Sequence, residues 1–263
     1  MRTAILALLV AAVAACSAPG QGATPTVTSL TIFGAASLKA ALDAAKTAYE
    51  RDAPGSTLVI STDSSAALET QIEQGADADV FLSADTTNPK KLVDRGFATG
   101  GPVVFAGNEL TIIVPSGNPA RIRSPVDLAR PGVKVIAAGD QVPITKYANQ
   151  LVANLATVAG YPSGFATAYA TNVVSKEDDV KAVVGKIELG EGDAAIVYLT
   201  DARASTKVST IPVPAAANVP ASYAGVVVKS STHQAGASRF LDWFAGPTGQ
   251  GILAEFGFLP PPS

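Results

Sequence analysis

The chain has 263 residues, of which 48% are hydrophobic and 16% are charged, so it can bury a large core and is not a disordered protein. The formal net charge is −3 and no run of basic residues occurs, which argues against a protein that binds nucleic acid by neutralising phosphates. One histidine and one cysteine are too few for a typical transition-metal cation site, and a single cysteine cannot form an intramolecular disulfide.

The N-terminal residues 1–15 are predicted to be a signal peptide. Arg2 supplies a positive charge, and residues 5–13 form an apolar stretch that is too short to span a bilayer. The segment Val13-Ala14-Ala15-Cys16 resembles a bacterial lipobox, which implies that Cys16 is lipidated and becomes the new N-terminus. The alternative is an ordinary signal peptide with a cysteine near its cleavage site by chance.

Residues 16–28 are rich in Ser, Ala, Pro, Gly and Thr, a composition typical of a flexible tether. No later apolar run approaches the length of a membrane span. We therefore expect an extracytoplasmic protein that is attached to the cell membrane by a lipid anchor on Cys16.

From residue 30 onward, short apolar runs alternate with helical patterns, which is typical of βα units and a mainly parallel sheet. The predicted strands are 30–33, 58–60, 80–82, 110–114, 133–138, 194–199 and 223–228. The predicted helices are 38–49, 68–75, a short one around 91–93, 143–158, one led by Glu177-Asp178-Asp179 that continues through 180–187, and 240–244. Two comparable α/β units fit this pattern better than a (β/α)₈ barrel, for which the chain has too few residues.

Three segments that are far apart in the sequence carry hydroxyl groups at the ends of apolar strands. Phe33-Gly34-Ala35-Ala36-Ser37-Leu38 and Thr62-Asp63-Ser64-Ser65 place serines where a strand gives way to a helix, and Ile196-Val197-Tyr198 ends a strand on a tyrosine. A helix start has unpaired N–H groups and the positive end of the helix dipole, so two such starts with hydroxyls suit an oxygen-rich anion. Taken singly, such a serine is more often a helix cap and such a tyrosine more often a core residue.

The segment 33–38 resembles the Phe-Ala-Ala-Ala-Ser-Leu motif of periplasmic molybdate-binding proteins of ABC transporters. The run from Gln71 to Asp85 resembles that family's block Gln-Ile-Glu-x-Gly-Ala-x-Ala-Asp-hydrophobic-Phe-x-Ser-Ala-Asp. Further matching segments follow in the same order: Gly139-Asp140, Val142-Pro143, Glu177 to Val180, Gly192 to Tyr198 and Glu255 to Phe258. The resemblance covers about residues 30–260.

The resemblance implies an α/β, two-lobed periplasmic-binding-protein fold, in which each lobe is a mainly parallel sheet flanked by helices. Residues 29–105 and 221–263 would form lobe 1, and residues 106–220 would form lobe 2. The ligand would lie in the cleft between the lobes, in keeping with the general rule for open α/β sheets.

The resemblance also implies which residues bind the anion. Ser37 and Ser65 would each give a hydroxyl and a backbone N–H, Ile144 and Val180 a backbone N–H, and Tyr198 a phenolic hydroxyl. The molybdenum would thus be bound as an oxyanion by these residues, with no cation site, no cofactor and no catalytic residue. Neutral donors favour fully ionised tetrahedral anions over hydrogen phosphate, whose own O–H would find no acceptor.

The implied function is to capture molybdate, and tungstate as well, and to deliver it to an ABC-transporter permease. The sequence gives no sign of an oligomer, so we expect a monomer. The alternative is a binding protein for another tetrahedral oxyanion such as sulfate. A serine hydrolase is a poor interpretation, because the chain has no Gly-x-Ser-x-Gly motif and its only histidine, His233, lies in a polar stretch.

Two positions depart from the family pattern. The family has Ala-Gly after its Val-Pro, whereas this chain has Ile144-Thr145, whose bulk could narrow the pocket. Asp63 stands where the family has a small neutral residue, and we expect its carboxylate to cap the helix or point away. Lys146, the basic residue nearest this loop, is expected to be a solvated helix position.

Overall fold

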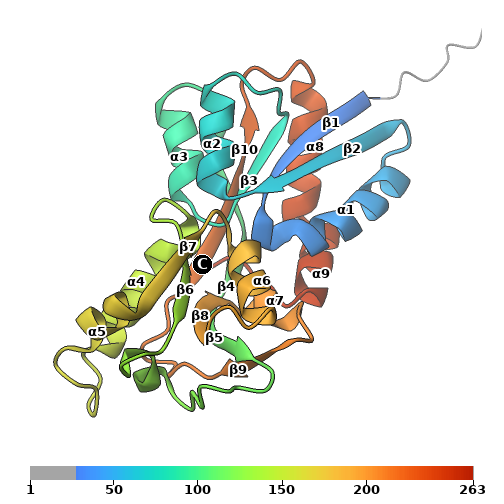
Figure 1. The fold of residues 1–263 in the computed structure, drawn as a ribbon. Helices are drawn as coiled ribbons and strands as arrows, with labels where there is room; N and C mark the ends of the chain where they lie inside the picture. Colours follow the sequence, from blue (N-terminus) through green and yellow to red (C-terminus); the bar gives the residue numbers. More distant parts are fainter. Residues whose placement is uncertain (1–27, 263) are drawn as a thin grey trace, which may run out of the picture.

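Two lobes, each built on a five-stranded sheet, make up the computed structural model, which describes residues 28–262 (Figure 1). The predicted signal peptide 1–15, the lipidation site Cys16 and almost all of the tether 16–28 lie outside the described residues. Within residues 28–262, none of the helices combines the length and apolar character needed to cross a membrane.

Lobe 1, the upper lobe in Figure 1, has the strand order β2-β1-β3-β10-β4. Its strands are β1 (Thr28–Ala35), β2 (Ser56–Asp63), β3 (Val80–Ser83), β4 (Ala98–Asn108) and β10 (Ala221–Val228). Its helices are the 3₁₀ turn η1 (Ala36–Leu38), α1 (Lys39–Asp52), α2 (Ser65–Glu73), α3 (Thr87–Asp94), α8 (Gln234–Ala245) and α9 (Pro247–Glu255). Only β10 runs against the other four strands, because it is antiparallel to both β3 and β4.

Lobe 2 repeats this plan with the strand order β7-β6-β8-β5-β9. Its strands are β5 (Leu110–Pro115), β6 (Val135–Ala138), β7 (Val173–Glu177), β8 (Ala194–Tyr198) and β9 (Val208–Ile211). Its helices are η2 (Pro125–Ala129), α4 (Pro143–Leu155), α5 (Phe165–Asn172), α6 (Val180–Glu188) and α7 (Leu199–Arg203). Here β5 is the single reversed strand, so the prediction of two mainly parallel sheets is confirmed.

The chain crosses between the lobes twice. The first crossing takes one residue, Glu109, between the end of β4 and the start of β5, and the second joins Ile211 to Ala221. The expected boundary between residues 105 and 106 therefore falls inside β4, which stays paired with β10 up to Asn108. The C-terminal segment returns to this crossing, where Leu259 forms a bridge with Gly107.

The carboxyl ends of the parallel strands meet at one edge of each sheet and face the other lobe. In lobe 1 the register pairs Ala35 at the end of β1 with Asp63 at the end of β2. In lobe 2 it pairs Ala138 at the end of β6 with Glu177 at the end of β7. Helix starts follow these ends directly, so the fold brings unpaired N–H groups of both lobes to one cleft.

Gly34 allows the helix after β1 to pack closely on the sheet. A Cβ atom on Gly34 would lie 2.3 Å from the Leu42 Cδ1 atom of α1, far inside van der Waals contact. The glycine thus lets the fully buried Leu42 side chain rest directly on the strand that ends at the cleft. This packing holds the turn that carries Ser37 in place.

Candidate functional site

All five residues predicted to bind an anion line one cavity between the lobes. Ser37 and Ser65 come from lobe 1, and Ile144, Val180 and Tyr198 come from lobe 2. Each is between 1% and 6% exposed, so the lobes are closed over them. The cavity is small, with a volume of about 10 Å³, and the described residues that line it include no lysine, arginine or histidine.

Ser37 lies in the turn after β1 and is held by a chain of hydrogen bonds. Its Oγ lies 3.0 Å from the Tyr223 hydroxyl, and the Asn108 side-chain amide donates to that hydroxyl at 3.3 Å. The orientation of the Asn108 amide is fixed because its Oδ1 accepts the Glu109 N–H at 2.9 Å. Since an NH₂ group can only donate, the Tyr223 oxygen accepts from Asn108 and its O–H is available for the Ser37 Oγ.

The consequence is that the Ser37 hydroxyl proton is free to point into the cavity. Burial raises the pKa of Tyr223 well above its usual value, with a further contribution from the negative charge of Asp201. Tyr223 therefore remains a neutral donor over the physiological pH range. Ser37 is then a donor toward whatever occupies the cavity.

Ser65 is the first residue of α2, and its hydroxyl oxygen accepts the Ala84 N–H at 3.0 Å. This bond uses the oxygen as an acceptor and leaves the O–H to donate elsewhere. The helix cap is provided by Ser64, whose Oγ accepts the Ala67 N–H at 3.2 Å. Ser65 is therefore not the N-cap, and its own N–H keeps no intrahelical partner.

Ile144 and Val180 lie in the first turns of α4 and α6. Pro143, which has no N–H, begins α4, and the Thr145 hydroxyl ties this turn to the Ala138 carbonyl at 3.0 Å. Asp179 caps α6, its Oδ1 accepting the Ala182 N–H at 2.8 Å. The N–H groups of Ile144 and Val180 are thus among those that the helices leave without an internal acceptor.

Tyr198 ends β8 and reaches across the cleft. Its hydroxyl oxygen lies 3.5 Å from the Ala84 carbonyl oxygen of lobe 1, a long and weak hydrogen bond. Its ring packs edge-on against Tyr147 and Tyr223, with centroids 6.1 and 5.6 Å away. Burial raises the pKa of Tyr198 well above its usual value, so the phenol remains a neutral donor.

Of the residues that depart from the family pattern, Ile144 lines the cavity, whereas Asp63 and Thr145 do not. Asp63 does not line the cavity, because its Oδ1 accepts the Ser64 N–H at 2.6 Å at the start of α2. Ile144 and Thr145 are both buried, with Thr145 bonded to β6. Lys146 is exposed, as expected, but also donates to the Thr87 hydroxyl of lobe 1 at 3.1 Å.

His233 lies outside the cavity lining, and its Nδ1 atom is 3.2 Å from the Asp79 carboxylate. The Ser231 hydroxyl also donates to Asp79, so it is not activated by the histidine. No group of three or more metal-ligating side chains occurs among residues 28–262.

The residues that support the predicted donors could not be found from the sequence. Asn108 and Tyr223 lie at the two crossings between the lobes, 71 and 186 positions from Ser37, and neither stands in a recognisable local motif. Asp179 is one of three residues in an acidic helix start, and the structure makes it the carboxylate on the cavity wall. The sequence does predict that Asp179 caps a helix, because an Asp directly before an apolar helical pattern is a common N-cap.

The comparisons with known proteins agree with this architecture. The family model described as "Bacterial extracellular solute-binding protein" matches residues 30–259. Molybdate-binding protein ModA of Mycobacterium tuberculosis H37Rv is 34% identical over 98% of this chain and 96% of its own length. The periplasmic molybdate-binding protein of Azotobacter vinelandii superposes with a TM-score of 0.74 and 26% identity, over 89% of this chain and 100% of that one.

A second solved structure, the sulfate-binding protein SubI of Mycobacterium tuberculosis H37Rv, has a TM-score of 0.79 over 89% of this chain and 87% of that one. At 23% identity this likeness shows the shared fold alone. The fold, the match of the family model over nearly all of the described residues and the similarity to ModA lead to one conclusion. The chain belongs to the bacterial extracellular solute-binding protein family.

Proposed function

We propose that this protein captures molybdate, and tungstate as well, in the cavity between its lobes and delivers it to an ABC-transporter permease. The observation that carries the proposal is the convergence of Ser37, Ser65, Ile144, Val180 and Tyr198 on one buried cavity. The similarity to ModA of Mycobacterium tuberculosis supports molybdate as the ligand. The protein itself makes and breaks no covalent bond in this role.

The cavity suits a dianion because its donors are neutral and already oriented. The helix starts of α2, α4 and α6 aim backbone N–H groups and the positive ends of their dipoles at the ligand. Each hydrogen bond to a charged ligand contributes on the order of 1.5–3 kcal/mol. The charge of the Asp179 carboxylate is offset at the start of α6, where it accepts a backbone N–H.

Closure of the lobes links capture to delivery. The Tyr198 hydroxyl and the Lys146 ammonium group both contact lobe 1 from lobe 2. A bound oxyanion bridging the same two lobes would stabilise this closed form over an open one, because it has donors on both sides only when the cleft is shut. A permease could then distinguish the loaded protein from the empty one by its shape.

The expected lipid anchor on Cys16 would keep the protein at the outer face of the cell membrane, next to such a permease. The lipobox-like segment Val13-Ala14-Ala15-Cys16 supports this part of the proposal. We further propose that the protein acts as a monomer without a cofactor. A Cys16→Ser variant should be released into the soluble fraction, and its retention in the membrane would refute the anchor.

Calorimetric titration with four anions at neutral pH tests the proposed ligand. We expect molybdate and tungstate to bind with one site per chain and sulfate and hydrogen phosphate to bind at least about 100-fold more weakly, a difference of roughly 2.7 kcal/mol. Sulfate binding as tight as molybdate would instead favour the alternative of a sulfate-binding protein. The absence of heat with all four anions would refute an oxyanion function.

A further inference from the structure

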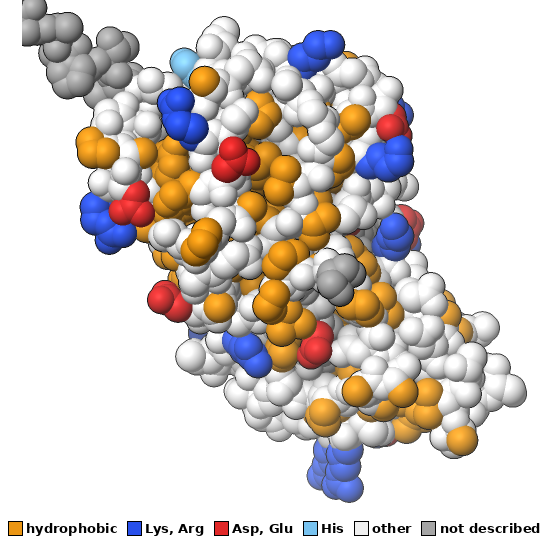
Figure 2. Space-filling view, turned by 180° about the vertical axis from the view of Figure 1, so that it is seen from behind, with side chains coloured by type: hydrophobic (Ala, Val, Ile, Leu, Met, Phe, Trp, Pro, Cys, Tyr) orange, Lys and Arg blue, Asp and Glu red, His pale blue; other side chains and the backbone are white. Residues whose placement is uncertain are grey.

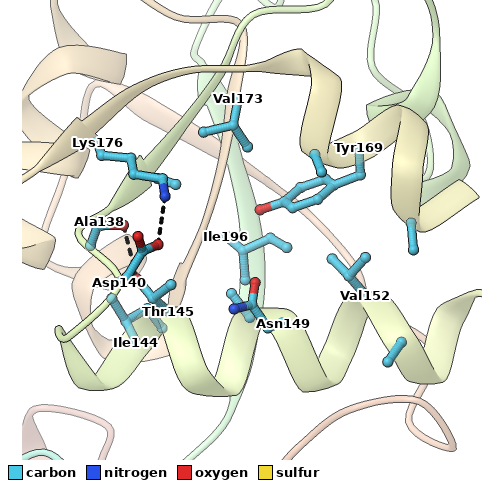
Figure 3. A pocket seen from close by; sticks show the side chains of 15 residues that line it. Ala138, Asp140, Ile144, Thr145, Asn149, Val152, Tyr169, Val173, Lys176 and Ile196 are labelled. Carbon is cyan, nitrogen blue, oxygen red and sulfur yellow. Dashed lines mark hydrogen bonds and ion pairs between the residues drawn. The ribbon is translucent and has the colours of Figure 1, made fainter.

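Lobe 2 contains a second cavity, separate from the one between the lobes. It lies between α4 and α5 against strands of the second sheet and has a volume of about 310 Å³ (Figure 3). Among the described residues, Ile144 alone lines both cavities. The volume falls at the lower end of the range found for small-molecule sites.

Most of the wall is apolar and built from small side chains. Ala148 and Val152 of α4 face Ala166 and Ala170 of α5 across the cavity, and Ile196 of β8 lies behind them. Ala148 is buried, whereas Ala166 and Ala170 are exposed, so these small side chains line an apolar cavity that opens to solvent. An occupant would therefore have an apolar body.

The Tyr169 side chain brings a polar group into this apolar space. It is 6% exposed, and Figure 3 shows its hydroxyl pointing into the cavity, toward Ile196. Within residues 28–262 this hydroxyl has no hydrogen-bond partner. The Tyr169 hydroxyl is not among the fully buried unpaired polar atoms of the described residues, so solvent reaches it through the cavity, and a ligand with an acceptor can take the place of water as its partner. Burial also raises the pKa of Tyr169 to about 12, so the group is a donor at neutral pH.

The charged groups of the cavity neutralise each other. Lys176 of β7 is paired with Asp140, which follows β6, at the end of the cavity away from α5 (Figure 3). The Thr145 hydroxyl is bonded to the Ala138 carbonyl, and the Asn149 amide is exposed (Figure 3). A charged ligand would lose its hydration without gaining an unpaired counter-charge, so a neutral ligand fits better.

We propose that lobe 2 carries a second binding site, for a small uncharged organic molecule with an apolar body and a carbonyl-type acceptor that takes the hydrogen bond of the Tyr169 hydroxyl. At about 30 Å³ for the volume of a water molecule, the cavity holds roughly ten non-hydrogen atoms. This proposal does not rest on the proposed function, because its test uses no oxyanion.

Acetophenone has this chemistry, and ethylbenzene has nearly the same shape without the carbonyl. Each compound is titrated into the whole chain while backbone amide signals are followed by two-dimensional NMR. We expect acetophenone to give saturable shifts at Ala148, Asn149 and Ala170, and ethylbenzene to bind roughly 3- to 10-fold more weakly. Equal affinity for the two compounds would overturn the role of the Tyr169 hydroxyl.

Three variants separate the site from unspecific binding. Tyr169→Phe should weaken acetophenone to the level of ethylbenzene, and Ala170→Leu should abolish binding of both by filling the cavity. Tyr161→Phe, a tyrosine of the same lobe that packs on Phe165 outside the cavity lining, should bind acetophenone like the unchanged protein. Unaltered lobe 1 signals show that each variant is folded.

The proposal is overturned if neither compound gives saturable shifts at the three cavity residues. It is also overturned if the folded Ala170→Leu variant binds acetophenone with unchanged affinity.

Discussion

The Ser37 hydroxyl is oriented by hydrogen bonds from residues that do not line the cavity. Asn108 donates to Tyr223, which leaves the Tyr223 hydroxyl free to donate to Ser37 and the Ser37 hydroxyl to donate to a ligand. A donor that is already oriented in the protein avoids the entropic cost of being ordered when the ligand binds. The Ala84 N–H likewise donates a hydrogen bond to the Ser65 hydroxyl oxygen, so both serine oxygens already act as acceptors and both O–H groups can donate to a ligand.

Tyr198→Phe tests the one phenol among the described residues that line the proposed site. The Kd for molybdate should rise roughly 10- to 100-fold, because a hydrogen bond to a dianion is lost while the ring packing against Tyr147 and Tyr223 is kept. Calorimetric titration measures the change, with Tyr161→Phe as the matched control that should leave the Kd unaltered. A Kd equal to that of the unchanged protein would remove Tyr198 from the site.

A double-mutant cycle tests the chain of hydrogen bonds behind Ser37. Tyr223→Phe should raise the Kd for molybdate by roughly 3- to 10-fold, because the Ser37 hydroxyl loses the donor that orients it. In a Ser37→Ala background the same change should have almost no further effect. Additive effects of the two substitutions would mean that Tyr223 acts by another route.

At the scale of elements, the site is made from helix starts that follow strand ends. Local patterns predict these elements well: the apolar run of β8 and the periodic helices after Ser37 and Ser65 are present in the structure. The start of β4 is not predictable in this way, because Ala98-Thr99-Gly100-Gly101-Pro102 has the composition of a turn and is mostly exposed. Its pairing with β10 comes from partners more than 100 residues away, which local propensity does not report.

The same limit explains which parts of the site the sequence could predict. Ser37, Ser65 and Tyr198 stand in short motifs at strand ends, and the resemblance of those motifs to a known family, rather than the residues taken singly, selects them as candidates. Asn108 and Tyr223 act because two crossings bring them beneath Ser37, and only the folded chain contains that information.

Substitutions of Asp179 test its role as the cap of α6 at the cavity wall. Asp179→Ala should lower the free energy of unfolding by about 1 kcal/mol, because the Ala182 N–H loses its acceptor. Asp179→Asn keeps an acceptor and should be close to the unchanged protein in stability. Urea unfolding compares the three proteins, and an equal loss for both variants would show that the charge, not the cap, is what matters.

At the scale of the whole molecule, the anion must approach a protein of its own sign. The chain has a formal net charge of −3, and a wider opening beside the cavity is lined by Asp63, Asp178 and Asp179. On the face drawn in Figure 2, basic side chains are dispersed among acidic ones and form no single patch that would attract an anion. Capture therefore depends on the short-range dipoles and hydroxyls of the cavity.

Asp63→Asn tests this unfavourable field at the entrance. The amide oxygen can still accept the Ser64 N–H, so the helix start is kept while one negative charge is removed. Association of molybdate should become about two- to three-fold faster at low ionic strength, and the gain should shrink in high salt. Stopped-flow measurements give both rates, and a gain that does not depend on salt would contradict an electrostatic cause.

The raised pKa values of buried tyrosines predict how the stability of the whole fold depends on alkaline pH. Burial raises the pKa of Tyr147 and of Tyr169 to about 12 from an ordinary value of 10.0. The folded state therefore holds these protons longer than the unfolded state does, and stability falls as the pH rises from about 10 through about 12. Below about pH 10 this contribution is present in full.

Urea unfolding on both sides of pH 10, with tyrosinate absorbance recorded in parallel, measures this loss. We expect a decrease in the free energy of unfolding that accompanies delayed ionisation of these phenols. Ionisation of every tyrosine near pH 10 in a protein that is still folded would contradict the prediction.

The most direct test of the proposed site is an X-ray structure of the protein soaked or co-crystallised with molybdate, measured at the molybdenum absorption edge. We expect one strong anomalous peak in the closed cleft, from a single tetrahedral oxyanion. That oxyanion should lie within hydrogen-bond reach of the Ser37, Ser65 and Tyr198 hydroxyls and of the Ile144 and Val180 N–H groups. A peak elsewhere on the protein, or none in crystals grown at saturating molybdate, would show that these five residues do not form the molybdate site.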